Sequence, residues 1–243
     1  MAQSSIEWTE MTWNPTTGCT KISSGCKFCY AEVMSKRLKG MRQQKYKDGF
    51  ELRIHPESLN IPYTWKSSKI VFVNSMSDLF HKDIPIDFVK KVFKVMNDNP
   101  QHIFQVLTKR ADYLYEINKE LEWSKNIWMG VTVENDKVID RIDFLRKTKA
   151  KIKFISFEPL IGGVPILNLK KIDWAIVGGE SGHNARAMNP EWVLDIQKQC
   201  NNENIAFFFK QWGTWSSDGI KRNKKVNGKE INGVIYQKMP INN

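Results

Sequence analysis

The chain has 243 residues, of which 41% are hydrophobic and 26% are charged. This length suits one barrel, one large α/β domain or two small domains, and the composition excludes a disordered or collagen-like chain. Lysine and arginine total 37 against 26 acidic residues, which gives a net charge of +11. So basic a chain favours a polyanionic partner such as nucleic acid, and an ordinary protein of a lysine-rich proteome is the alternative.

The sequence has no stretch that approaches the roughly 18 apolar residues of a membrane span. The N-terminal sequence MAQSSIEWTE lacks the basic start and the apolar run of a signal peptide. We therefore expect a cytoplasmic protein, in which thiols stay reduced. The four cysteines are then expected to serve as ligands or catalysts rather than to form disulfides.

The first predicted strand lies within residues 8–13, and a C-x6-C-x2-C array formed by Cys19, Cys26 and Cys29 follows it. Glycine and serine residues between these cysteines let the backbone wrap around a single metal centre. Zinc normally needs a fourth protein ligand, and the histidines lie far away in the sequence. Three thiolates alone suit an iron-sulfur cube with one iron left open, and a zinc knuckle or three unrelated cysteines is the alternative. Cys200 falls in a predicted amphipathic helix and is expected to be a buried thiol.

Residues 36–69 are polar, basic and turn-rich, and they predict an insertion or a long crossover. After them, short apolar segments alternate with stretches that are compatible with helices. Continuous apolar runs are typical of strands that are buried on both faces of a parallel sheet. The predicted strands cover residues 70–74, 103–108, 127–133, 153–157, 174–177 and 205–209.

Two of the intervening segments carry clear helical signals. Residues 86–97 place Phe88, Val92, Val95 and Met96 on one stripe, and Asn189-Pro190 is a typical helix start. The alternation predicts an α/β fold, a partial or closed (β/α) barrel with about seven parallel strands, and a doubly wound open sheet is the alternative.

The chain shows no linker long enough to divide it into two domains. We expect one barrel domain over residues 1–215, with residues 36–69 inserted in it. Residues 216–243 contain the basic run at 221–225 and predict a solvent-exposed tail or a hairpin.

Polar residues follow each predicted strand, and in a barrel these positions converge on the rim that carries the active site. Simpler structural roles are also open, since Asp78 can cap a turn and Glu158 or Glu180 can pair with Lys109 or Lys210. The candidates at this rim are Ser75, Ser77, Asp78, Lys109, Glu134, Glu158, Gly178, Gly179, Glu180 and Lys210.

Several motifs resemble a phage-associated three-cysteine-motif family, a divergent branch of the radical SAM superfamily. The segment Cys26-Lys27-Phe28-Cys29 is similar to the end of the radical SAM cluster motif, although six residues rather than the usual three separate the first two cysteines. The resemblance extends to about Trp215 and includes the following motifs: WNP at 13–15, GC at 18–19, SGC at 24–26, CYA at 29–31, VNSMSDLFH at 73–81, QVLTKR at 105–110, GVTVEN at 130–135, FEPL at 157–160, VGGESG at 177–182 and FFKQWG at 208–213.

This resemblance implies a [4Fe-4S] cluster held by Cys19, Cys26 and Cys29, with S-adenosylmethionine on the open iron. It implies reductive cleavage of S-adenosylmethionine to a 5′-deoxyadenosyl radical, with the electron supplied by a reductant protein.

The chemistry of the polar residues agrees with this picture. Ser75, Ser77 and Asp78 follow the second strand, where radical SAM proteins commonly hold the amino group of the cofactor. Glu134 and Glu158 are expected to hold the ribose hydroxyls, and Gly178 and Gly179 to let the backbone approach the adenine, against which Phe28 is expected to pack. Lys109, Arg110, Arg186 and Lys210 are candidates to bind the cofactor carboxylate or an anionic substrate. Glu180 completes the cofactor-binding set.

The substrate is predicted from charge alone. The basic segment from Lys36 to Lys47 and the run at 221–225 favour a nucleic acid or a nucleotide as the target of modification or repair. Peptides and small metabolites remain open as substrates. The alternative function is a zinc-stabilised nucleic-acid-binding protein without catalysis.

Overall fold

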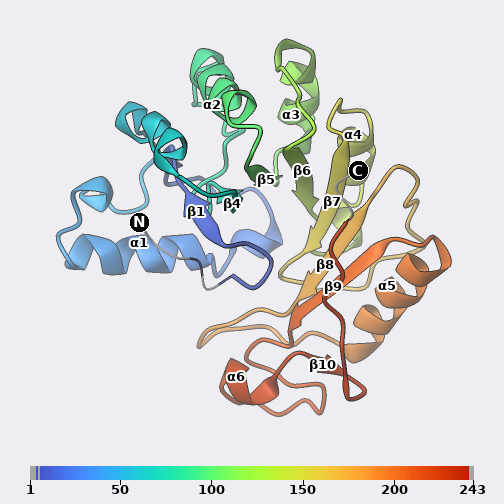
Figure 1. Cartoon of the computed structure of the whole chain (residues 1–243). Helices are drawn as coiled ribbons and strands as arrows, with labels where there is room; N and C mark the ends of the chain where they lie inside the picture. Colours follow the sequence, from blue (N-terminus) through green and yellow to red (C-terminus); the bar gives the residue numbers. More distant parts are fainter. Residues whose placement is uncertain (1–3, 5, 241–243) are drawn as a thin grey trace.

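The computed structural model describes residue 4 and residues 6–240 of the chain. Seven parallel strands form one sheet in the order β1-β4-β5-β6-β7-β8-β9. The sheet curls into a half-barrel, which confirms the predicted α/β fold with a partial barrel (Figure 1). The strands are β1 (Met11–Trp13), β4 (Ile70–Val73), β5 (Ile103–Thr108), β6 (Ile127–Thr132), β7 (Ile152–Phe157), β8 (Trp174–Gly178) and β9 (Ala206–Gln211).

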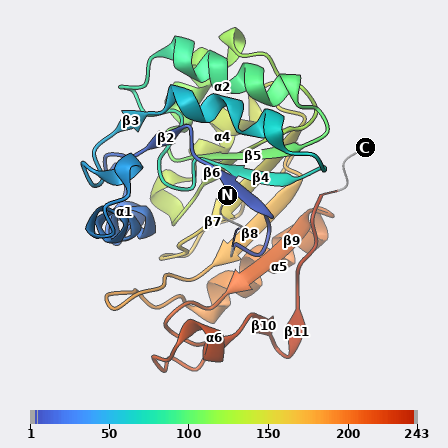
Figure 2. The same cartoon turned by 60° about the vertical axis from the view of Figure 1, so that its left-hand side comes forward.

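Helices cover the outer face of this sheet, while α1 (Tyr30–Gly40) lies to one side of it (Figures 1 and 2). The predicted apolar stripe of the first outer helix is buried against the sheet. The last outer helix begins as predicted, because the Asn189 side chain accepts a hydrogen bond from the Glu191 amide at 2.9 Å. The outer helices are α2 (Ile86–Asp98), α3 (Ala111–Ile117), α4 (Arg141–Arg146) and α5 (Pro190–Asn202).

Both faces of the sheet are buried, which explains the continuous apolar runs. In β4, Val71 and Val73 belong to the core under the helices, whereas Phe72 belongs to a second core on the inner face. Trp8 fills this inner face, since its ring centroid lies 4.8 Å from that of Phe72 and 6.1 Å from that of Trp174. The segment before β1 therefore packs inside the half-barrel near the amino ends of the strands.

The segment predicted as an insertion or a crossover connects β1 to its sheet neighbour β4. Its first residues, from Lys36, belong to α1, and it then forms β3 (Arg53–Ile54). This strand pairs antiparallel with β2 (Thr16–Thr17), which follows β1 directly. The crossover therefore returns to the carboxyl end of β1, where the cysteine array begins.

The last part of the chain forms α6 (Lys224–Asn227) and a hairpin of β10 (Glu230–Ile231) and β11 (Val234–Ile235). Of the two predicted forms, a tail or a hairpin, the hairpin is present, and it packs on the barrel through the buried Ile231. The Phe209 amide donates to the Tyr236 carbonyl at 2.8 Å. The edge strand β9 thus finds a partner for backbone groups that the sheet leaves unpaired.

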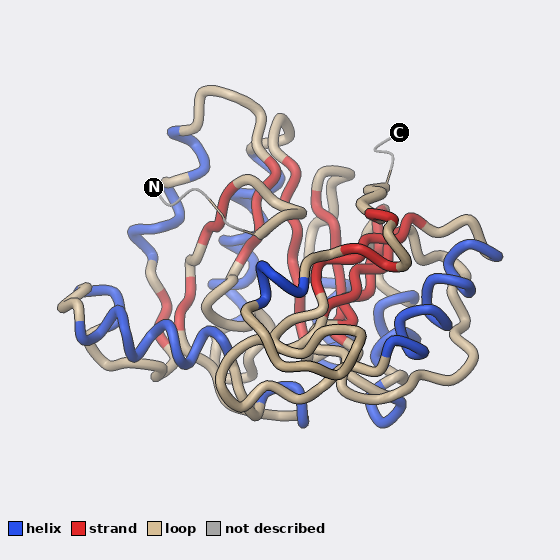
Figure 3. Tube along the Cα trace, turned by 90° about the horizontal axis from the view of Figure 1, so that it is seen from below, coloured by secondary structure: helices blue, strands red, loops and turns tan. Residues whose placement is uncertain are grey.

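Because every strand of the sheet is parallel, the loops that follow the strands share one edge of the half-barrel. Figure 3 views the molecule from this side, and long loops lie in front of the strands. Across the described residues, none of the helices is long and apolar enough to cross a membrane.

A glycine on the inner face tests the packing of the half-barrel. A Cβ atom at Gly130 would lie 2.4 Å from the ring of the fully buried Phe154. We predict that Gly130→Ala lowers the free energy of unfolding by about 1–3 kcal/mol, measured by urea denaturation. Gly40→Ala is the control, because apart from its chain neighbours and the backbone of its own helix no atom lies within 4 Å of the added methyl group. Equal stability of the two variants would contradict the packing described for the inner face.

Candidate functional site

The cysteine loop, residues 18–29, lies over the carboxyl edge of the half-barrel. Its backbone is attached to the loop after β4, because the Gly18 amide donates to the Met76 carbonyl at 3.0 Å. Cys19, Cys26 and Cys29 are all half-buried and form no disulfide. Cys29 is the N-cap residue of α1, so the loop ends where that helix begins.

The donor set of this loop fits a three-thiolate cluster, because three free and accessible thiols lie within eleven residues of one loop. Two of the three thiols have another contact within the loop. Cys19 Sγ donates to the Thr20 carbonyl at 3.4 Å, and Cys26 Sγ lies 3.7 Å from Ser23 Oγ. As they stand, the described His, Cys, Asp and Glu side chains form no group of three or more that is arranged to hold a metal ion. Cluster binding thus requires the thiols to turn away from these contacts.

Cys19 lies in a largely buried environment that contains both a positive and a negative side chain. Burial, followed by the negative charge of Asp78, raises the pKa of Cys19 to about 11. Arg110 opposes this effect, since its Nη1 lies 3.4 Å from the sulfur. Without a metal, Cys19 is therefore a neutral thiol at physiological pH.

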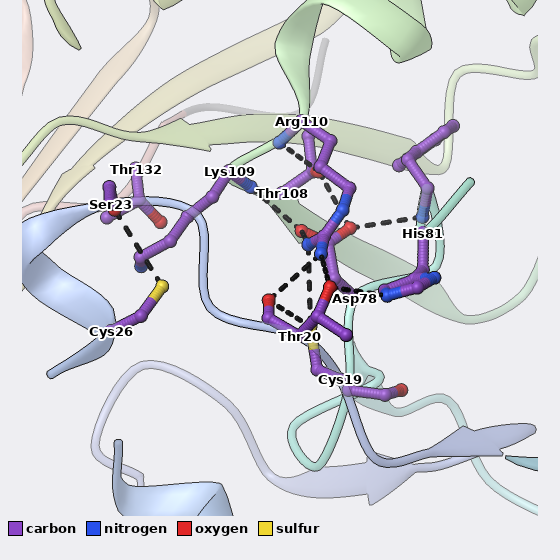
Figure 4. A network of polar contacts seen from close by, with 12 residues as sticks. Cys19, Thr20, Ser23, Cys26, Asp78, His81, Thr108, Lys109, Arg110 and Thr132 are labelled. Carbon is purple, nitrogen blue, oxygen red and sulfur yellow. Dashed lines mark hydrogen bonds and ion pairs between the residues drawn. The ribbon is translucent and has the colours of Figure 1, made fainter. Parts of the chain in front are cut away.

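Asp78 organises the strand ends behind Cys19 (Figure 4). Its carboxylate accepts from Thr108 Oγ1 at 2.7 Å, from the Lys109 amide at 3.0 Å and from Arg110 Nη1 at 3.2 Å. It also accepts from the Phe80 amide at 3.0 Å, which is the turn cap that the sequence allowed. The predicted contact of Asp78 with an amino group stays a prediction, and it would compete with these four bonds.

Arg110 extends this network into the cysteine loop. Its Nη2 donates to both the carbonyl and the hydroxyl oxygen of Thr20, each at 3.0 Å. The same hydroxyl lies 2.8 Å from His81 Nε2, and His81 is fully buried. Burial and the charge of Arg110 lower the pKa of His81, so this histidine is neutral and serves as a packed support.

Glu134 attaches the cysteine loop to the centre of the sheet. Its side chain is fully buried, and its carboxylate is 2.9 Å from Arg141 Nη1 and 3.7 Å from Lys109 Nζ. Ser23 donates its hydroxyl proton to the same carboxylate at 2.6 Å. A Cβ atom at Gly25 would lie only 2.4 Å from this side chain, so the loop needs glycine there. The predicted ribose contact of Glu134 stays a prediction beside these bonds.

The remaining rim carboxylates also form ion pairs. Glu158 lies 2.9 Å from Lys210 Nζ, which is one of the two ion pairs that the sequence analysis offered for this residue. It also accepts a hydrogen bond from Ser156 Oγ at 3.2 Å. Glu180 pairs with Arg186 rather than with the expected Lys109 or Lys210. The rim is therefore a set of matched charges rather than a set of free carboxylates.

Arg186 connects the loop after β8 to the cysteine loop. Its Nη1 donates to the Ser24 carbonyl at 2.9 Å, and its guanidinium carbon lies 5.4 Å from the centre of the Phe28 ring. Hydrogen bonds to Glu180 raise the pKa of Arg186, which stays charged. Phe28 is half-buried and already has two cationic neighbours, this guanidinium and Lys27 Nζ, which also lies 5.4 Å from the centre of the ring.

The two glycines predicted to approach adenine contact the protein itself. A Cβ atom at Gly178 would lie 2.7 Å from Glu158 Oε1, and one at Gly179 would lie 1.9 Å from the Trp212 carbonyl oxygen. The packing of β8 against neighbouring chain segments thus accounts for both glycines.

The two predicted serines also bind within the chain. Ser75 Oγ donates to Asn14 Oδ1 at 3.3 Å, and Ser77 Oγ lies 2.6 Å from Thr16 Oγ1. Both serines therefore hold the loop after β4 against the loop after β1.

Sequence reasoning missed Ser23, Thr20 and Arg141 as parts of this site. The run Ser23-Ser24-Gly25 between two cysteines was the available signal for a tightly bound turn. Nothing in the sequence indicates that Arg141, in the helix after β6, turns back to a carboxylate at the end of the same strand.

Residues 3–240 match a family described as a protein of unknown function (DUF5131). The match spans nearly the whole chain, so the chain belongs to this family. No curated protein and no solved structure matches the chain significantly.

The buried pair of Asp78 and Arg110 predicts a large loss of stability on truncation. We expect Asp78→Ala to lower the free energy of unfolding by about 3–5 kcal/mol, because Arg110 is left buried without its counter-charge. Urea denaturation measures this loss. The control is Asp218→Ala, which breaks an exposed pair with Arg222 and should leave the midpoint unchanged. Similar midpoints for the two variants would show that Asp78 does not organise the site.

Proposed function

We propose that this member of the DUF5131 family is a radical SAM enzyme. The observation that carries the proposal is the position of three free thiols in one loop over the carboxyl edge of a parallel half-barrel. Enzymes with parallel barrels do their chemistry at this edge. Three cysteines leave one iron of a [4Fe-4S] cluster without a protein ligand, which is the iron that S-adenosylmethionine would occupy.

When bound, the cluster supplies the electron that cleaves S-adenosylmethionine to methionine and a 5′-deoxyadenosyl radical, which abstracts hydrogen from a substrate. Cys19, Cys26 and Cys29 would hold the cluster through their thiolates. Arg110 lies against Cys19, with its Nη1 3.4 Å from the sulfur. This cation favours an anionic metal centre, because a positive neighbour stabilises a thiolate.

The inner face of the barrel offers polar groups for the bound S-adenosylmethionine. Glu158 and Lys210 form a half-buried pair at the ends of β7 and β9, next to Ser156. Lys210 carries the charge that a carboxylate needs, and Glu158 accepts hydrogen bonds from hydroxyl groups. We assign these two residues to the cofactor ahead of Asp78 and Glu134, whose carboxylates have more partners within the chain.

The partners follow from charge and chemistry. A one-electron reductant protein is needed, because the proposed reaction starts with the reduction of the cluster. The net charge of +11 supports a nucleic acid or a nucleotide as the substrate, for modification or repair. Four cysteines without a disulfide support a place in the cytoplasm.

We predict that Cys19→Ala, Cys26→Ala and Cys29→Ala each abolish iron binding. The wild-type chain, reconstituted without oxygen, should hold about four iron atoms and absorb near 400 nm, because three thiolates are the minimum set for this cluster. Chemical analysis measures the iron content, and absorption spectroscopy measures the cluster band.

Cys200→Ala is the matched control, because Cys200 is fully buried in α5 and far in the sequence from the loop. It should keep the iron content of the wild type. Loss of iron in this variant would refute the three-ligand assignment. A colourless wild-type protein that contains zinc would refute the proposed function and favour a zinc-stabilised binding protein.

A further inference from the structure

An open pocket of about 540 Å³ lies between the loop after β8 and the C-terminal extension. Ser181, Gly182 and His183 form one wall, and the basic run at 221–225 forms the other. None of its lining residues is acidic. The pocket is therefore suited to an anion.

Two of the four cations of this pocket already have a partner within the chain, and two do not. Arg222 pairs with Asp218, and Lys221 Nζ donates to the His183 carbonyl at 2.6 Å. Lys224 and Lys225 are exposed, and neither has an ion-pair partner within the described part of the chain. Two unmatched ammonium groups in one hollow attract phosphate strongly.

The pocket is connected to the cysteine loop through the loop after β8. Ser181 and Gly182 directly follow Glu180, and Glu180 holds Arg186 in an ion pair. Arg186 in turn donates to the Ser24 carbonyl in the cysteine loop. Two side chains, those of Glu180 and Arg186, thus connect the wall of this pocket to the cysteine loop.

A second basic pocket, of about 370 Å³, lies at the other end of the sheet. Lys45, Lys47 and Arg53 line it together with Glu57. Arg53 pairs with Asp48, and Lys45 donates to the carbonyl of Asn14, which directly follows β1. Lys47 is exposed and has no ion-pair partner within the described part of the chain. Strands β1 and β9 are the two ends of the sheet order. The cysteine loop starts from the β1 side and contacts Arg186 on the β8 side, so it lies between the two pockets.

We propose that the two basic pockets bind phosphates of one single-stranded nucleic acid that passes the cysteine loop. Two cationic pockets on either side of a site match a polymer of phosphates better than one small anion. A single strand is favoured over a duplex, because a base must leave the stack before an enzyme site can reach it. The binding of this strand is argued from the pockets alone. Its role as the substrate rests on the proposed function.

The test measures the binding of a labelled single-stranded oligonucleotide to the full chain by fluorescence anisotropy, from about 50 to about 200 mM salt. The logarithm of affinity should fall linearly with the logarithm of salt. The double variant Lys224→Ala, Lys225→Ala should bind several-fold more weakly at low salt, with a slope smaller by about 0.7 for each lost contact. Lys47→Ala should reduce the slope in the same way.

The matched control is the double variant Lys91→Ala, Lys125→Ala, which removes two exposed charges from α2 and from the turn before β6. It should keep the wild-type slope. Equal salt slopes in all variants would overturn the proposal. A reduced slope in the variants of only one pocket would show that the strand does not bind both pockets, and would also overturn it. If polyglutamate displaces the labelled strand as effectively as unlabelled oligonucleotide does, the pockets bind acidic protein equally well, and the assignment of a nucleic acid ligand is overturned.

The oligonucleotide assay also separates this proposal from the proposed function. Cys19→Ala should lose its iron and keep the binding of the strand, because the pockets do not include the thiol. If a folded Cys19→Ala variant loses both its iron and its binding of the oligonucleotide, binding depends on the metal centre. That result would overturn the two-pocket site.

Discussion

The candidate site depends on the buried carboxylate of Glu134, which holds the cysteine loop against the sheet. It is fully buried at the end of β6, the fourth of seven strands in the sheet. Arg141 matches its charge, and Ser23 of the cysteine loop donates to it. Since a buried charge must be paired and hydrogen-bonded, the loop that carries the thiols is held against the middle of the barrel rim.

The same constraint shapes the rest of the rim. Asp78, Glu158 and Glu180 each have a cation from this chain, supplied by Arg110, Lys210 and Arg186 respectively. These pairs hold the loops after the strands in place and leave few free carboxylates. The three thiols are therefore the distinctive chemical groups of the rim, and the proposed function follows from them rather than from the acidic residues.

Much of the fold follows from the sequence, because strands that are buried on both faces need continuous apolar runs. The run at 127–133 became β6 (Ile127–Thr132), and the stripe at 86–97 became the buried face of α2. The closeness of strand ends could also be predicted, since parallel strands share a carboxyl edge. The ion pair of Glu158 with Lys210 was among the pairings that the sequence offered, whereas the partner of Glu180 could not be predicted. Glu180 meets Arg186 because the loop after β8 turns back on itself, and no periodicity encodes that turn.

The measurement that tests the central claim most directly is the formation of 5′-deoxyadenosine by the anaerobically reconstituted chain. Dithionite would supply the electron, and chromatography would follow S-adenosylmethionine and its products. The account predicts 5′-deoxyadenosine together with methionine, dependent on both the cluster and the reductant. A protein that holds its cluster but forms no 5′-deoxyadenosine on reduction would contradict the claim that the cysteine loop is a radical SAM site.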